Sequence, residues 1–65
     1  MVSQKDVYIT AQMLLKKHGD KANSYAHHMM LSLMEKDDLQ GAGVWLSIGQ
    51  AIEDLRNKKR QGKLH

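Results

Sequence analysis

Apolar side chains recur every three or four residues in three successive stretches of this chain, which is the spacing that one face of an α-helix requires. Proline is absent, and the alternation typical of β-strands is hard to find. The pattern predicts helices over about residues 3–18, 21–36 and 41–58. We therefore expect an all-α fold, a small three-helix domain in a bundle or a hairpin-plus-helix arrangement that self-associates.

The ends of the predicted helices carry recognisable capping residues. Ser3 is placed to cap the first helix, with Asp6 three residues later where a capping box has its acid. Gly19 suits the left-handed residue that follows a helix end, and it comes directly after a cationic last turn. Asp37 or Asp38, in a polar turn, is expected to cap the third helix.

We expect the single tryptophan, Trp45, to anchor the core. We expect its ring to pack near Tyr25 or Tyr8, so that Trp45→Ala would cost about 3–5 kcal/mol, as large aromatic deletions do. Gly49 interrupts the third helix beside its apolar stripe. Two interpretations of Gly49 stay open: another helix approaches closely there, or the helix tolerates a glycine.

The size of the chain limits how much stability a core can supply. Its 65 residues form one small domain, and a fold of this size gains only about 3–5 kcal/mol from its core. Cysteine is absent, which excludes disulfides, thiolate catalysis and cysteine-based zinc sites. Oligomerisation is the simplest remaining way to stabilise the fold. Neither a signal peptide nor a membrane span is recognisable, so we expect a cytoplasmic protein without membrane association.

Charge divides the chain into two parts. Residues 1–55 hold five lysines and seven acids and sum to −2, whereas residues 56–65 sum to +5 and hold no acid. We interpret 1–55 as a helical domain and 56–65 as a basic tail whose last residues fray. The tail is expected to bind an acidic partner or nucleic acid through its cations, Arg56, Lys58, Lys59, Arg60 and Lys63.

Each predicted helix also carries apolar residues that lie outside its inner stripe, the apolar face expected to pack against the core. They are Ile9 and Met13 on the first helix, Leu31 on the second and Leu46 on the third. Exposed apolar patches on soluble proteins usually mark contacts with another molecule. We expect these four residues to bind a protein partner or a second copy in a homodimer. The alternative is that the helices pack more broadly than their apolar stripes indicate.

Catalytic, cofactor-binding and metal-binding patterns are not apparent in the sequence. His27 and His28 are adjacent, so on a helix they point about 100° apart and do not chelate one ion. His18 could join either of them only through tertiary contact, as a metal or small-ligand carrier would require. The acidic pairs at 37–38 and 53–54 are explained by capping and solvation. We expect no enzyme activity, no cofactor and no small-molecule substrate.

Nucleic-acid binding is the main alternative function. Residues 14–31 can be aligned as a helix-turn-helix with Gly19 in the turn, but Asp20 and His28 then stand where apolar residues are needed. The basic tail could nevertheless hold phosphates in a salt-sensitive way that ignores base sequence. The alternative is therefore a nucleic-acid accessory protein.

One set of residues forms a recognisable pattern: His18-Gly19-Asp20-Lys21-Ala22, Tyr25-Ala26, Gly41, Val44-Trp45, Ile48, Ala51-Ile52 and Leu55. Over about residues 8–55 this pattern resembles a group of short bacterial all-helical proteins. In that group a helix ends in His-Gly, the next opens with a spaced alanine pair, and a Gly…Val-Trp…Ile…Ala-Ile…Leu helix follows. The resemblance implies a compact helical fold and leaves function open.

The surplus apolar residues lead us to predict a non-enzymatic protein–protein interaction module, a small adaptor or modulator in a larger bacterial assembly.

Overall fold

Helices account for nearly all of the described chain. The computed structural model describes residues 3–63, and it describes side chains for residues 3–57. Within this range the structure contains no strand, so the predicted all-α class is confirmed. The elements are α1 (Gln4–His18), a 3₁₀ turn η1 (Gly19–Lys21), α2 (Ala22–Glu35) and α3 (Leu39–Lys63).

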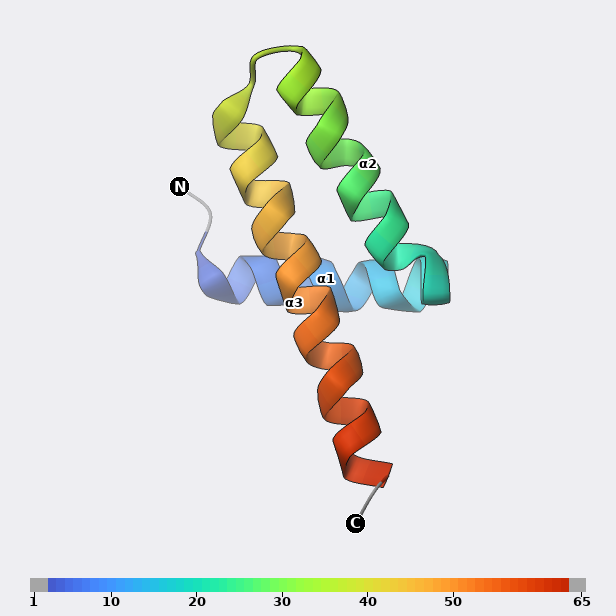
Figure 1. The fold of residues 1–65 in the computed structure, drawn as a ribbon. Coiled ribbons are helices and arrows are strands. Elements are labelled where there is room, and N and C mark those ends of the chain that lie inside the picture. The colour runs from blue at the N-terminus through green and yellow to red at the C-terminus, as the bar shows by residue number, and fades with distance from the viewer. Residues whose placement is uncertain (1–2, 64–65) are drawn as a thin grey trace.

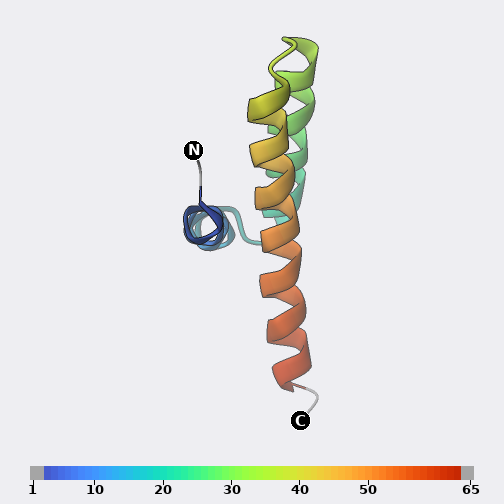
Figure 2. The same ribbon diagram turned by 90° about the vertical axis from the view of Figure 1, so that its left-hand side faces the viewer.

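The helices are arranged as a hairpin crossed by a single helix. α2 and α3 run antiparallel side by side, and α1 crosses one side of this hairpin (Figure 1). Turned by 90°, the hairpin is seen on edge with α1 end-on beside it (Figure 2). The C-terminal part of α3 extends past the start of α2. The hairpin therefore has one side that α1 partly covers and one side that α1 does not reach.

α1 begins and ends at the predicted residues. The Ser3 hydroxyl accepts a hydrogen bond from the Asp6 backbone N–H at 3.2 Å, which satisfies one of the free donors at the helix start. Gly19 has a φ of +58°, and its N–H donates to the Leu15 carbonyl. Glycine adopts this backbone without strain because it has no Cβ.

The two aspartates in the turn between α2 and α3 have different structural roles. Asp37 takes a left-handed φ of +61°. The N–H of Asp38 donates to the Leu33 carbonyl at 2.9 Å and the N–H of Asp37 to the Met34 carbonyl at 3.0 Å, which is a Schellman motif. The Asp38 carboxylate also accepts a hydrogen bond from the Gly41 N–H at 3.0 Å. Asp38 thus caps α3 directly after α2 has ended.

Asp38→Ala is expected to destabilise the fold by about 1 kcal/mol, because it removes the N-cap of α3. Chemical denaturation followed by circular dichroism measures this loss. Asp37→Asn is a nearby comparison that removes the same charge, tolerates the left-handed backbone of Asp37 and leaves the cap intact. Equal unfolding free energies for Asp38→Ala and wild type would contradict the capping role.

Alanine forms most of the core. The buried cluster joins all three α-helices, and among its members Ile52 is the one large side chain that is fully buried. Partly buried neighbours, Trp45 among them, pack around this cluster. Trp45 packs against the core as predicted, but from a partly buried position, and the large side chain that the cluster buries fully is Ile52. The buried cluster consists of Val7, Ala11, Ala22, Ala26, Ile48, Ala51 and Ile52.

Trp45 packs at the edge of the core, against Tyr25. Tyr25 was one of the two neighbours predicted for it from the sequence, and Tyr8 was the other. The two rings meet edge to face with centroids 5.8 Å apart. Gly49 lies beside α2, where an added Cβ would be 3.9 Å from the Cβ of Ala26. That distance is ordinary van der Waals contact, so the packing of α2 against α3 does not require a glycine at this position.

α3 is longer than the sequence predicted. It begins at Leu39 and continues through Lys63, so the predicted boundary at residue 56 falls inside a continuous helix. The predicted fraying covers 61–65; residues 61–63 are helical, and residues 64–65 lie outside the described residues. No helix of the described chain has both the length and the apolar character needed to cross a membrane.

Candidate functional site

The four apolar residues predicted to contact a partner are all exposed. Ile9 is 46% exposed, Met13 65%, Leu31 45% and Leu46 51%. Broader packing of the chain's own helices, which was the alternative, does not cover them. Their role in binding stays a prediction, because exposure alone does not identify a partner.

These four residues do not form one patch. Ile9 and Met13 are each two residues from buried Ala11, which places them about 200° around α1 and away from the hairpin. Leu46 lies about 140° around α3 from Ala51, and Ala51 lines a groove shared with α1. We call Ile9 and Met13 the α1 outer face; Leu46 lies on the opposite side of the molecule.

An apolar groove runs between α2 and α3 on the side that α1 does not cover. Its volume is about 280 Å³. Leu46 and Met30 stand on its two walls, and Trp45 and Gly49 line it between them. Polar groups gather at one end. The lining residues are Asn23, Ala26, His27, Met30, Trp45, Leu46, Gly49, Gln50 and Glu53.

Two further exposed residues lie in register with this groove, and sequence reasoning missed both. Leu39, 69% exposed, precedes Leu46 by two helical turns, and Met34, 49% exposed, follows Met30 by one turn. The seven-residue spacing of the leucines was the available signal, but the third helix was predicted over about residues 41–58, which leaves Leu39 out. We define the hairpin face as Met30, Met34, Leu39 and Leu46. Leu31 follows Met30 by one residue, about 100° around α2, and does not line the groove.

A polar network that includes Asn23 and Glu53 closes the polar end of the groove. The Arg56 guanidinium donates to Asn23 Oδ1 at 2.7 Å, and Asn23 Nδ2 donates to Glu53 Oε1 at 3.3 Å. A second Arg56 nitrogen lies 3.9 Å from an Asp20 oxygen. Arg56 was predicted to be a tail cation for a partner, but the structure ties it to α2 and η1. The side chains of the other four, Lys58, Lys59, Arg60 and Lys63, lie outside the described residues.

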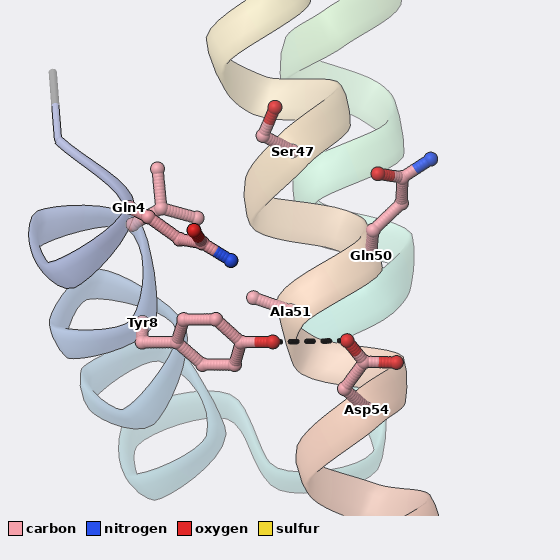
Figure 3. Close-up of a pocket in the computed structure, with 7 residues that line it drawn as sticks. Gln4, Tyr8, Ser47, Gln50, Ala51 and Asp54 are labelled. Carbon is pink, nitrogen blue, oxygen red and sulfur yellow. Dashed lines mark hydrogen bonds between the residues drawn. The ribbon is translucent and has the colours of Figure 1, made fainter.

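A second groove, between α1 and α3, is polar. Figure 3 shows Tyr8 pointing from α1 toward Asp54 on α3, with Gln4, Ser47 and Gln50 around them. The groove has a volume of about 340 Å³. The Tyr8 hydroxyl donates to Asp54 Oδ2 at 3.0 Å. This hydrogen bond links residues 46 positions apart in the chain, so it adds a polar contact to the apolar packing of α1 against α3.

The same contact changes the acidity of Tyr8. Its hydrogen bond to Asp54, and then the negative charge of that carboxylate and slight desolvation, raise the pKa of Tyr8 above its usual 10.0. The phenol therefore stays protonated and donates at neutral pH. Neither sequence nor spacing indicated this pair, because it depends on how two distant helices cross.

Asp54→Asn is expected to lower the pKa of Tyr8 toward 10.0, because it removes the charge that opposes ionisation. Because the pKa of Tyr8 is higher in the folded state than in the unfolded state, its protonated form stabilises the fold. This stabilisation is fully present below pH 10 and is lost as the pH rises through the folded-state pKa. The Tyr8 Cζ chemical shift followed against pH measures the titration. An unchanged midpoint in Asp54→Asn would contradict the contact.

The histidines are distributed over different environments. His18 stacks on Tyr25 with ring centroids 4.6 Å apart, while His27 lines the apolar groove and His28 is exposed. Within residues 3–57 no three metal-binding side chains are grouped to hold an ion. The structure therefore does not bring His18, His27 and His28 together as the carrier alternative requires.

Comparison with known proteins does not indicate a function for this chain, so the two grooves and the exposed apolar residues are the features from which a function can be inferred. No protein-family model, curated protein or solved structure matches this chain. The resemblance to a group of short bacterial helical proteins therefore stays a prediction.

Proposed function

We propose that this chain is a non-enzymatic protein–protein interaction module that binds through the hairpin face. One observation carries the proposal: Leu46 is half exposed on the wall of an apolar groove, with exposed apolar residues before and beside it. Contiguous exposed apolar surface on a soluble domain usually marks a contact. The α1 outer face, Ile9 and Met13, is a second and smaller apolar surface.

The composition of the hairpin face favours a protein over a nucleic acid. None of its four residues is charged, whereas nucleic-acid binding depends on cations that neutralise phosphates. Two of the four are methionines, whose flexible side chains adapt to the shape of another chain. The bound protein is either another chain of a larger assembly or a second copy of this one.

The basic end of α3 supports the alternative, a nucleic-acid accessory role. Four cations, Lys58, Lys59, Arg60 and Lys63, follow Arg56 with no acid among them. Arg56 itself donates to Asn23, which leaves four cations to carry this role. Such binding would weaken steeply as salt rises, because each phosphate contact releases counterions. Apolar contact would respond little to salt.

Affinity capture with matched variants tests the proposal. Leu46→Asp places a charge on the hairpin face, and Gln40→Asp places the same charge on exposed α3 surface outside it. We expect wild type and Gln40→Asp to retain bound protein and Leu46→Asp to lose it, with little change between low and moderate salt. Equal capture by all three, or binding that disappears with salt and with removal of residues 58–65, would contradict the proposal.

A further inference from the structure

The line of leucines on the hairpin face leads along α3 to a carboxylate. Leu39, Leu46 and Glu53 follow one another at intervals of seven residues, so they lie on one side of the helix and about 10 Å apart. Leu46 and Glu53 both line the groove between α2 and α3. A partner that covers the two leucines and follows the groove therefore also meets Glu53.

Hydrogen bonds hold the Glu53 side chain at the polar end of the groove. Arg56 donates to Asn23 Oδ1 at 2.7 Å, and Asn23 Nδ2 donates to Glu53 Oε1 at 3.3 Å. Within residues 3–57 the ion pair of Arg56 is with Asp20, at 3.9 Å, and not with Glu53. Because Asn23 is neutral, its hydrogen bond orients the Glu53 carboxylate and leaves the second oxygen, Oε2, to accept from a bound molecule.

The acids of this network outnumber its cation. Asp20 and Glu53 supply two negative charges and Arg56 one positive charge, a net of −1. Complementary charge across an interface attracts the right partner and fixes its register, while like charge rejects the wrong one. A cation of the partner is therefore favoured at Glu53. The basic residues 58–63 farther along α3 favour the opposite charge, so an experiment can separate the two parts of the helix.

The shape of the groove suits a helix whose cation has an apolar stem. Two adjacent helices leave between them a groove that accepts a ridge of side chains from a third, and helices bound in grooves use anchors three, four and seven residues apart. Gly49 lines the groove one turn before Glu53 and places no side chain there. Lysine and arginine fit this position because their apolar stems pack along a wall while their charged heads reach a carboxylate.

We propose, resting on the interaction function above, that the groove binds an amphipathic helix of another protein that carries a lysine or arginine. Apolar side chains of that helix cover Leu39 and Leu46. The stem of its cation lies over Gly49, and its charged head donates to Glu53 Oε2. Glu53 thereby selects the partner by charge and sets its register along α3.

Two designed peptides that differ at one position test this proposal. Each has about 20 residues, long enough to form a helix, with two leucines seven positions apart. The test residue stands seven positions beyond the second leucine, and it is lysine in one peptide and glutamate in the other. A second pair of peptides has the reverse order, so that both chain directions are covered.

Fluorescence anisotropy of the labelled peptides measures their affinities. Trp45, the single tryptophan of the chain, lines the groove, so its emission reports whether binding takes place there. In one of the two chain directions, we expect wild type to bind the lysine peptide about two- to fivefold more tightly than the glutamate peptide, which is the range of an exposed ion pair.

Variants at Glu53 test whether its carboxylate causes the preference. Glu53→Gln keeps an acceptor for Asn23 and removes the charge, so we expect it to bind both peptides equally. Glu53→Lys is expected to reverse the preference. Glu35→Lys makes the same change of charge on exposed α2 surface outside the groove and is expected to behave like wild type. Far-UV circular dichroism establishes that each variant remains helical.

Equal binding of the two peptides by wild type, binding of neither, or a lysine preference that persists in Glu53→Lys would overturn the proposal. So would a preference for the glutamate peptide that disappears with residues 58–65, because it would assign the contact to the basic end of α3. Capture of another protein that is lost in Leu46→Asp, together with equal peptide binding, would leave the interaction function standing. Capture and peptide binding that both survive Leu46→Asp would contradict both proposals.

Discussion

Ile52→Ala is expected to abolish the cooperative unfolding transition. The Ile52 side chain is fully buried and has only small or partly exposed residues around it, so its removal leaves a cavity that the neighbours cannot fill. Such substitutions cost about 2–5 kcal/mol, and a fold of this size has about 3–5 kcal/mol to lose. Thermal unfolding followed by far-UV circular dichroism, at one protein concentration, measures the effect.

Ile9→Ala is the matched control for this substitution. It removes the same atoms from an exposed position on α1, and exposed substitutions usually change stability by no more than about 0.5 kcal/mol. Trp45→Ala is expected to cost less than Ile52→Ala, because Trp45 is only partly buried. A larger loss for Trp45→Ala would restore the tryptophan as the centre of the core.

Ala11→Asp is expected to detach α1 from the hairpin and unfold the domain. Ala11 is fully buried in the cluster that joins α1 to the hairpin, and an unpaired carboxylate in that position costs several kcal/mol. Met13→Asp makes the same change two residues later at an exposed position and is expected to melt like wild type. Denaturation curves for the pair measure the difference. Equal destabilisation by the two variants would contradict the orientation of α1.

The sequence predicted the helices because their signals are local. Ser3, Gly19 and Asp38 act on backbone groups within a few residues, so their roles could be recognised without tertiary structure. The extent of α3 was harder to predict. Loss of apolar periodicity after residue 55 indicated a tail, whereas the structure continues the helix through Lys63. Apolar periodicity shows which residues of a helix pack against a neighbouring helix. A helix that extends past its neighbours can continue without apolar periodicity.

The candidate surfaces depend on how the helices cross, which the sequence did not specify. Ile9, Met13 and Leu46 were correctly expected outside the inner stripes, and all are exposed. Their division between two sides of the molecule follows from the position of α1 on one side of the hairpin. The contact of Arg56 was not predicted for a related reason: its charge resembles that of the residues after it, while its position on α3 brings it to Asn23.

Backbone amide chemical shifts recorded over a dilution series test the central claim, that the hairpin face is the contact surface of this chain. The account predicts that any concentration-dependent shifts lie in the amides around Met30–Met34 and Leu39–Leu46, while those around Ile9 and Met13 stay unchanged. A spectrum that does not change with concentration would exclude a second copy, and the same spectra recorded with the captured protein then test the hairpin face. In either series, shifts confined to α1 would contradict the account.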